Sequence, residues 1–182
     1  MNNKWNMYKK LTKFTAKSDI KPVLQHIECR ELKIDNPFLV GRHFVATDSF
    51  KMAITMAKTP VNYDFEFPIG FYTVERYNQI AKAKNLTDIK TALLGFDEYQ
   101  KQNNLVGVPF ESIVEETFGK EAEPISHVYD LVLLKDVIEL KMEVEKDAGT
   151  KSFAQRGNML TVHDDLITIL LMRRTDKVHP HR

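Results

Sequence analysis

Apolar and charged residues alternate at helical spacing near the start of the chain. Between residues 4 and 16 the apolar positions, Trp5, Leu11 and Phe14 among them, fall on one arc when successive residues are placed about 100° apart. The opposite arc is basic, has no acidic member, and consists of Lys9, Lys10, Lys13 and Lys17. This pattern predicts an amphipathic helix over residues 4–16. Its basic arc is typical either of a solvated face or of a surface that meets a polyanion.

The apolar stretches that follow alternate with the two-residue period of strands. They predict a first strand from Val23 and further strands at 38–46 and 50–56. Asp35-Asn36-Pro37 and Asp48-Ser49 mark the turns between these strands. The N-terminal helix is therefore expected to lead into a three-stranded meander.

A second cycle of elements begins near residue 64. Residues 65–71 are strand-like, Thr73 is placed to cap a helix over residues 74–84, and residues 89–96 are predicted as another strand. The faint recurrence of strand, helix and strands indicates an internal repeat.

The remainder of the chain is less regular until its last hairpin. Residues 97–128 are polar to acidic and interrupted by Gly and Pro, which predicts an insertion or a mobile loop. A short strand at 129–132 is expected to run into a helix at 133–142. Residues 159–163 and 166–172 are predicted to form a hairpin.

The composition is that of one globular domain covering residues 1–182. Hydrophobic residues make up 43% of the 182, which is enough for a sizeable core, and the basic tail at 174–182 is expected to be disordered. The one cysteine, Cys29, excludes an internal disulfide, fits a reducing compartment, and is expected to be a buried thiol. Without a signal-peptide pattern or an apolar run of membrane length, the protein is expected to be soluble and cytoplasmic, with no membrane association.

The formal net charge of +1 hides an asymmetric distribution. Residues 1–21 carry six lysines and one acid, whereas residues 111–147 carry eleven acids and four lysines. The N-terminal part is therefore suited to a polyanion, and the acidic stretch would be repelled by one.

No catalytic arrangement is recognisable in the sequence. There is no Gly-rich phosphate-binding motif. Paired acids such as Glu115-Glu116 have no apolar surroundings that would shift the pKa of a general acid. His163, Asp164 and Asp165 would suit a metal by composition, but adjacent positions on a tight turn point to different sides. The sequence therefore predicts a protein that is not an enzyme, with no catalytic residues, no metal and no cofactor.

Two segments carry a resemblance to a known family. Residues 16–28 read Ala-Lys-Ser-Asp-Ile-Lys-Pro-Val-Leu-Gln-His-Ile-Glu, and residues 45–53 read Val-Ala-Thr-Asp-Ser-Phe-Lys-Met-Ala. Together they resemble the start of a middle domain of the bacterial DNA polymerase III β subunit, the sliding clamp. In that family a short polar loop ending in Asp-x-Arg leads into a strand, and a second strand a few residues later reads Val-Ala-Thr-Asp-(Gly/Ser)-(His/Phe/Tyr)-Arg-Leu-Ala. Lys21 and Lys51 stand where the family has Arg, which removes the planar fork of that side chain.

The resemblance implies an α+β fold of the DNA-clamp type, with repeated strand–helix–strands units and helices on one face of a mainly antiparallel sheet. It also implies a non-catalytic role in DNA replication, as a processivity factor or as a stand-alone relative of phage origin. Its implied partners are duplex DNA, bound without sequence preference, and DNA polymerase or other replication proteins. The family's pocket for polymerase lies between neighbouring domains, so no peptide-binding residues are carried over. The expected DNA-binding residues are Lys9, Lys10, Lys13, Lys17, Lys21, Arg76 and Lys82.

Several readings of the chain remain open at the level of sequence. A lone domain would encircle DNA only as a higher homo-oligomer closed through its sheet edges. It would otherwise be an interaction module that binds a replication protein through those edges or through the acidic stretch 111–147. A small enzyme of unrecognised type is the third functional reading, and an unrelated α+β domain with an ordinary strand at residues 45–47 is the alternative to the clamp fold. In each case Val45 or Ala46 is expected to be buried and Asp48 to hold a tight turn by bonding nearby backbone amides.

Overall fold

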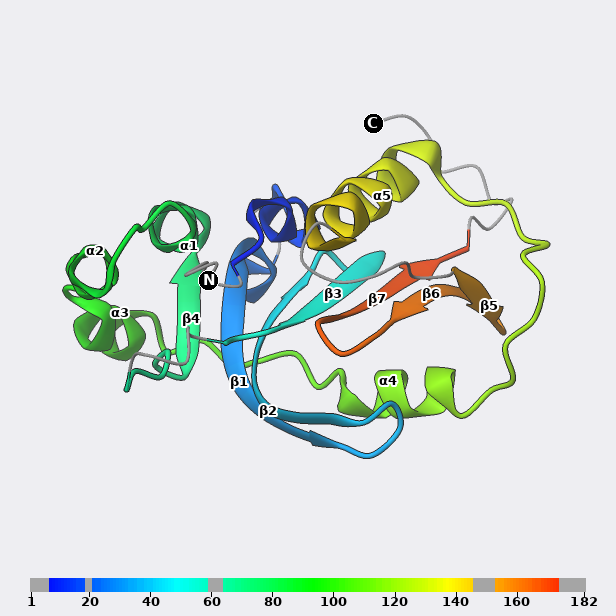
Figure 1. Cartoon of the computed structure of the whole chain (residues 1–182), viewed down its shortest axis with the longest axis horizontal. Helices are drawn as coiled ribbons and strands as arrows, with labels where there is room; N and C mark the ends of the chain where they lie inside the picture. The colour runs from blue at the N-terminus through cyan, green and yellow to red at the C-terminus, as the bar shows by residue number, and fades with distance from the viewer. Residues whose placement is uncertain (1–6, 19–20, 59–63, 146–152, 174–182) are drawn as a thin grey trace.

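A seven-stranded antiparallel sheet organises the protein, with helices on both of its faces (Figure 1). The computed structural model describes residues 7–18, 21–58, 64–145 and 153–173. Along the sheet the strands follow the order β4-β1-β2-β3-β7-β6-β5. The strands are β1 His26–Ile34, β2 Leu39–Thr47, β3 Lys51–Met56, β4 Gly70–Thr73, β5 Ala154–Arg156, β6 Met159–His163 and β7 Ile167–Met172. The predicted α+β class and the antiparallel sheet are therefore confirmed.

Two of the helices, at residues 74–81 and 86–92, follow residues whose side chains accept hydrogen bonds from the first turn. Thr73 Oγ1 accepts from the N–H of Arg76 at 3.1 Å, which confirms the predicted cap, and Asn85 Oδ1 accepts from the N–H of Asp88 at 2.9 Å. The two 3₁₀ helices are η1 Lys9–Phe14 and η2 Pro22–Gln25. The α-helices are α1 Val74–Ala81, α2 Leu86–Ala92, α3 Phe96–Asn103, α4 Glu111–Phe118 and α5 Leu131–Glu145.

The sheet contains two helix–meander units that meet at its centre. The first unit is η1 followed by β1, β2 and β3, and the second is α5 followed by β5, β6 and β7. Strands β3 and β7 pair in antiparallel register, with Ala53 opposite Ile169, and join the two meanders into one sheet. The two helices lie side by side on the same face (Figure 1). This recurrence is not the predicted repeat, whose second cycle was expected at residues 64–96, where the structure has β4, α1, α2 and the start of α3.

The first face of the sheet is covered by η1, α1 and α5. Phe44 of β2 lies near the middle of this core, with ring centroids 5.4 Å from Tyr72 and 5.3 Å from Tyr77, both in edge-on geometry. Such aromatic pairs contribute about 0.5–1.5 kcal/mol beyond the burial of their area. Ala46 points to the same face as Phe44, and Val45, which lies between these two residues in β2, points to the other face. Val45 and Ala46 are both buried, as predicted.

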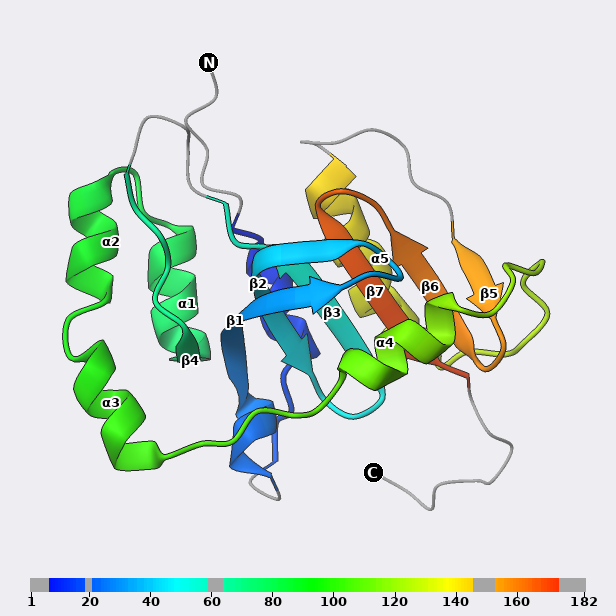
Figure 2. The same ribbon diagram turned by 90° about the horizontal axis from the view of Figure 1, so that it is seen from below.

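The second face has its own core, which is formed largely by α4 (Figure 2). Phe110, Val114 and Phe118 pack there against Leu32 and Ile54 of the sheet. The expectation of helices on one face only is therefore wrong. The reason is that β1, β2 and β3 are apolar on both sides, so both of their faces must be covered.

The N-terminal helix differs from its prediction in type and extent. Residues 9–14 form a 3₁₀ helix, Thr15 is extended, and residues 4–6 lie outside the described part of the chain. The hydroxyls of Thr12 and Thr15 donate to the carbonyls three residues earlier, at 2.9 and 2.8 Å. These short-range bonds and the crowding of β-branched side chains favour the tighter helix over a continuous α-helix.

Three further elements differ from the sequence prediction. Residues 89–96, predicted as a strand, belong to α2 and the beginning of α3, because Asn85 caps a helix just before them. The strand expected at 65–71 pairs with the sheet only from residue 70, and the pairing continues to residue 73. No strand precedes α5 at residues 129–132, because Asp130 Oδ1 accepts from the N–H groups of Val132 and Leu133 and starts the helix there. The segment 97–128 contains most of α3 and all of α4.

Both edge strands of the sheet are covered by polar groups of other segments. The N–H of Phe71 in β4 donates to Gln100 Oε1 at 2.8 Å, and Gln100 Nε2 donates back to the Phe71 carbonyl at 3.0 Å. The side-chain amide of Gln100 thus takes the place of a neighbouring strand. At the other edge, Gln155 of β5 exchanges two backbone hydrogen bonds with Glu123, at 2.8 and 3.2 Å. These contacts occupy backbone groups through which another chain would pair with the sheet.

Candidate functional site

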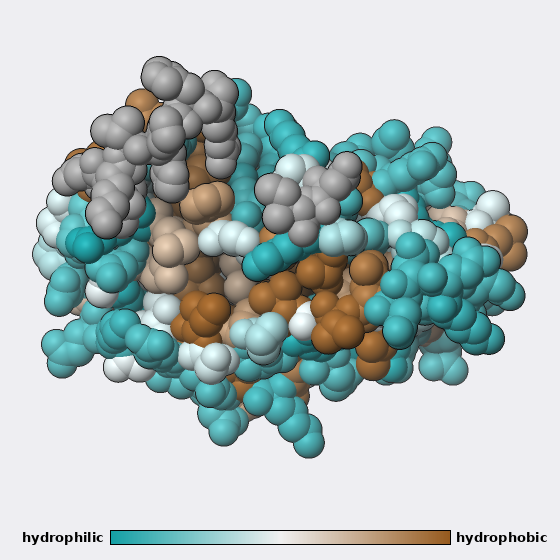
Figure 3. Space-filling model, turned by 180° about the vertical axis from the view of Figure 1, so that it is seen from behind, coloured by the Kyte–Doolittle hydropathy of each residue, from teal (hydrophilic) through white to brown (hydrophobic). Residues whose placement is uncertain are grey.

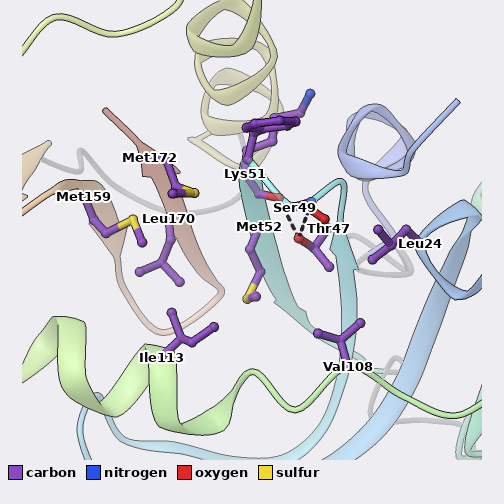
Figure 4. Close-up of a pocket in the computed structure, with 11 residues that line it drawn as sticks. Leu24, Thr47, Ser49, Lys51, Met52, Val108, Ile113, Met159, Leu170 and Met172 are labelled. Atoms are coloured by element: carbon purple, nitrogen blue, oxygen red, sulfur yellow. Dashed lines mark hydrogen bonds between the residues drawn. The ribbon is translucent and has the colours of Figure 1, made fainter. Parts of the chain in front are cut away.

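An apolar groove with a volume of about 220 Å³ lies on the second face of the sheet, beside α4 (Figure 4). Strands β3 and β7 form its floor, and α4 and η2 form its sides. Seen from this side, apolar side chains gather in the middle of the molecule between polar regions (Figure 3). The residues that line the groove are Leu24, Thr47, Ser49, Phe50, Lys51, Met52, Val108, Ile113, Met159, Leu170 and Met172.

The rim of the groove is open to solvent, which distinguishes it from the buried cores. Phe50, Ile113 and Met172 are 38%, 42% and 44% exposed, respectively. Met52 and Leu170 lie deeper and are largely buried. Methionine side chains are flexible and polarisable, so a surface that contains several of them adapts to apolar side chains of different shapes. The groove is therefore suited to hold apolar side chains from another molecule.

Asp48 builds the loop at one end of the groove. Its Oδ1 accepts hydrogen bonds from the N–H groups of Phe50 and Lys51, at 2.9 and 3.0 Å. Thr47 Oγ1 donates to the Lys51 carbonyl at 2.9 Å and accepts from the N–H of Ser49 at 3.2 Å. These bonds hold Ser49 in the left-handed region, at a φ of 80°. The role predicted for Asp48 is therefore confirmed, and its effect is to fix Phe50 at the rim.

Lys51 contributes to the groove wall but directs its ammonium group away from it (Figure 4). Its Nζ lies 2.9 Å from Asp48 Oδ2 and 2.8 Å from Asp136 Oδ2 of α5, and its side chain is only 5% exposed. The same atom lies 5.6 Å from the centre of the Phe14 ring. This buried ion pair connects the loop of the groove to α5 and η1 on the first face of the sheet.

Two lysines of the predicted basic arc contact a carboxylate of α5. Lys10 Nζ and Lys13 Nζ lie 3.1 and 2.6 Å from Glu139 Oε2. Hydrogen bonds from Lys13 and then Lys10 lower the pKa of Glu139 to about 2, and the bond to Glu139 raises the pKa of Lys13. Glu143 accepts from the backbone N–H groups of Lys9 and Lys10, at 3.2 and 2.8 Å. The acidic side of α5 therefore offsets part of the positive charge expected on η1.

The other predicted DNA-binding residues are spread over separate elements. Lys9 and Lys17 are exposed at η1, Lys21 is exposed at the start of η2, and Lys82 is exposed at the end of α1. The guanidinium of Arg76 is turned onto α3. Its Nη2 donates to the carbonyl of Leu94 at 3.0 Å, and its Cζ lies 5.5 Å from the Phe96 ring centre. The predicted residues thus belong to three different elements, and the Arg76 guanidinium is engaged within the chain.

Only part of these sites is readable from the sequence. Asp136, Glu139 and Glu143 lie three and four residues apart, which places them on one side of a helix and is a readable signal for an acidic face. The groove has no such signal, because Met159 and Met172 come from the second helix–meander unit and Met52 from the first. Only the fold brings them together.

Within the described ranges, no group of three His, Cys, Asp or Glu side chains could hold a metal ion. Burial raises the pKa of the Cys29 thiol to about 12, so this buried cysteine is protonated at neutral pH, as expected for a structural thiol. No helix in the described part of the chain is long and apolar enough to cross a membrane.

Comparison with known proteins gives no match: no family model, no curated protein and no solved structure matches this chain. Its function is therefore inferred from the groove and from the charged surface around η1 and α5.

Proposed function

We propose that this protein is a non-catalytic interaction module that binds an apolar peptide segment of a partner protein in the groove beside α4. The observation that carries the proposal is the open apolar groove with its exposed rim residues Phe50, Ile113 and Met172. Exposed apolar surface is costly in water, and a concentrated patch of it is typical of a binding site.

The size of the groove favours side chains of a peptide over a small molecule. Sites for small molecules and cofactors usually have volumes of roughly 300–1,000 Å³, and this groove has about 220 Å³. Its lining carries few polar groups, and the hydroxyl of Thr47 is already bonded to the Lys51 carbonyl. A partner segment with two or three neighbouring Leu, Met or Phe side chains would fill this volume and bury the rim.

The two segments that resemble the sliding clamp both contribute to the groove. Leu24 comes from the segment 16–28, and residues 47–52 come from the segment 45–53. The paired helix–meander units are also compatible with the clamp-like fold that the resemblance implies. On this basis we propose that the fold is clamp-like and that the partner is a DNA polymerase or another replication protein.

The covered sheet edges favour an interaction module over a ring. Ring closure through the sheet would require the outward-facing backbone groups of β4 and β5, and those of Phe71 and Gln155 are bonded to Gln100 and Glu123. The carboxylates of α5 also reduce the positive charge around η1 that a DNA channel would need.

Binding of defined peptides to matched variants tests the proposal. A panel of fluorescent peptides with two or three adjacent Leu, Met or Phe residues is titrated with the protein, with serine-substituted peptides as controls. Met172→Glu and Ile113→Glu place a charge on the rim and are expected to weaken binding about tenfold or more. Leu94→Glu, at a 73% exposed position between α2 and α3, is the control and should bind as the wild type does. The proposal fails if no peptide of the panel binds or if all three variants bind equally.

A second candidate function is a DNA sliding-clamp-like protein that binds duplex DNA without sequence preference. The exposed lysines Lys9 and Lys17, together with the sequence resemblance, favour it. Binding should then fall steeply with salt and be lost in a Lys9→Glu/Lys17→Glu variant, whereas Lys101→Glu on α3 should have little effect. Absence of affinity for duplex DNA at low salt would eliminate this candidate.

A further inference from the structure

The guanidinium of Arg30 joins strand β1 to the residues around the beginning of α4. Its Nε and Nη2 donate to the two carboxylate oxygens of Glu28, at 2.8 and 2.9 Å, and this double contact fixes the plane of the group. Nη1 donates to Glu111 Oε1 at 2.6 Å, and Nη2 also donates to the carbonyl of Val108 at 3.2 Å. Arg30 therefore has one partner on its own strand and two within residues 108–111.

The strap, residues 104–110, is the segment that Arg30 holds. It is neither helix nor strand and runs from α3 to α4 across the second face of the sheet (Figure 2). It pairs with no strand of the described sheet, so side chains hold it in place. Arg30 Cζ lies 4.7 Å from the centre of the Phe110 ring, at the end of the strap.

Gly107 is the point at which the strap comes closest to the ion pair. A Cβ atom on Gly107 would overlap Arg30 Nη2 and would lie 2.7 Å from Glu28 Oε1. Only glycine therefore allows this close approach. The strap and β1 are fitted to each other at Arg30 from both sides.

The residues next to these contacts form one side of the groove. Val108 of the strap and Ile113 in the first turn of α4 both line it, and their side chains face its floor (Figure 4). The guanidinium binds the Val108 carbonyl directly, and it binds Glu111 two residues before Ile113. Arg30 itself does not line the groove, so it acts on the groove through the position of these two residues.

We infer that Arg30 determines the size of the side chains that the groove accepts, by holding the strap and the first turn of α4 in place. This inference rests on the proposed function of the groove. Charge-assisted hydrogen bonds hold the wall, so a larger side chain enters only if these bonds break. A ligand side chain that overfills a packed site loses affinity, and the wall held by Arg30 therefore favours Leu or Met over Trp.

Replacing Arg30 should free the strap without detaching α4. Phe110, Val114 and Phe118 are buried in the core of the second face, and they keep the helix on the sheet. Arg30→Met is therefore expected to fold. Arg42→Met is the matched control, because Arg42 is also partly buried, with its side chain 27% exposed against 19% for Arg30. Arg42 Nη1 donates to the carbonyl of Phe67 at 2.6 Å, on the first face of the sheet.

Two versions of the best-binding apolar peptide, with Leu or Trp at the central apolar position, measure the size preference. The wild type should bind the Leu version about tenfold more tightly than the Trp version. In Arg30→Met this ratio should fall to about threefold or less, because the wall then yields to the larger side chain. Gly107→Ala should lower the ratio in the same way, because its Cβ displaces the guanidinium from the strap. Arg42→Met should keep the wild-type ratio, whatever stability it loses.

Amide hydrogen exchange in the free protein tests the positioning without any peptide. The N–H of Val114 donates to the Phe110 carbonyl at 3.0 Å in the first turn of α4, and that of Gly119 donates to the Glu115 carbonyl at 2.9 Å at its end. Arg30→Met should speed exchange at Val114 and leave Gly119 unchanged. Wild-type exchange at Val114 in Arg30→Met, or an unchanged Leu-to-Trp ratio in that variant, would overturn the inference. If the wild type binds no peptide, the proposed function fails, and the exchange at Val114 alone decides whether Arg30 holds the strap.

Discussion

Replacing Lys51 by methionine should destabilise the protein far more than the same change at Lys13, although both lysines pair with carboxylates of α5. Lys51 is 5% exposed and contacts Asp48 and Asp136 at 2.9 and 2.8 Å. Lys13 is 37% exposed and contacts Glu139 at 2.6 Å. The shorter of these contacts is thus the more exposed one, so the pair of variants separates the effect of burial from the effect of distance.

The expected magnitudes follow from what each substitution leaves behind. Lys51→Met leaves Asp48 and Asp136 with side chains only 14% and 17% exposed and without their shared cation. Removing one partner of a buried ion pair costs about 3–5 kcal/mol. The lower end, about 3 kcal/mol, is expected because Asp48 keeps two backbone donors. Lys13→Met removes a pair that is more accessible to solvent than that of Lys51 and should cost about 0.2–1 kcal/mol.

Urea unfolding followed by circular dichroism measures both values, provided that the free energy of unfolding depends on urea concentration with the same slope in all variants. The double variant Lys51→Met/Asp136→Leu should recover much of the loss, because it removes a buried carboxylate that would otherwise keep only the more distant Lys13, at 3.7 Å. A Lys13→Met variant as unstable as Lys51→Met would refute the reasoning, because burial would then not determine the strength of these pairs.

Three further outcomes are expected. Asp48→Ala should lower the free energy of unfolding by about 1–2 kcal/mol, because two backbone N–H groups lose their acceptor; an unchanged urea midpoint would show that the loop does not depend on Asp48. Gln100→Ala should speed amide hydrogen exchange at Phe71, and wild-type protection there would mean that another group covers β4. The Glu139 carboxylate should titrate in NMR spectra at a pKa of about 2. Since its pKa is lowered on folding, its contribution to stability is present above the ordinary pKa of Glu and is lost as the pH falls toward 2. Lys13→Ala should return this midpoint toward the ordinary value.

Local patterns predicted the first half of the sheet well. The Asp48-Ser49 turn and the cap at Thr73 were readable because each depends on residues within three positions along the chain. The two-residue alternation from residue 38 to residue 56 was equally local, since it reflects which side of the sheet each residue occupies.

The errors arose where two local signals competed. Residues 89–96 contain an apolar run that suits a strand, but Asn85 and Asp88 carry the capping pattern of a helix, and the cap decides the outcome. The helices were expected on one face because an apolar strand can be read as half-buried or as buried on both sides. Val114 and Phe118 of α4 cover the second face of the sheet, and they lie in a segment whose overall composition is polar to acidic.

The candidate sites were hidden because they depend on contacts between distant residues. The basic arc of η1 was visible in the sequence, but its neutralisation by Glu139 and Asp136 requires η1 and α5 to lie side by side. The groove likewise requires β3 and β7 to pair, since Met52 and Met172 are far apart along the chain. Neither spacing nor composition contains that information.

The most direct test of the proposed function uses the methionine methyl groups as reporters of where a peptide binds. The protein is labelled at its methionine methyls and titrated with the best-binding apolar peptide of the panel. The resonances of Met52, Met159 and Met172 should shift in proportion to the bound fraction, whereas Met56 and Met142, which do not line the groove, should stay in place. Saturable shifts confined to Met56 or Met142, or no shift at any methionine, would contradict the assignment of the groove as the binding site.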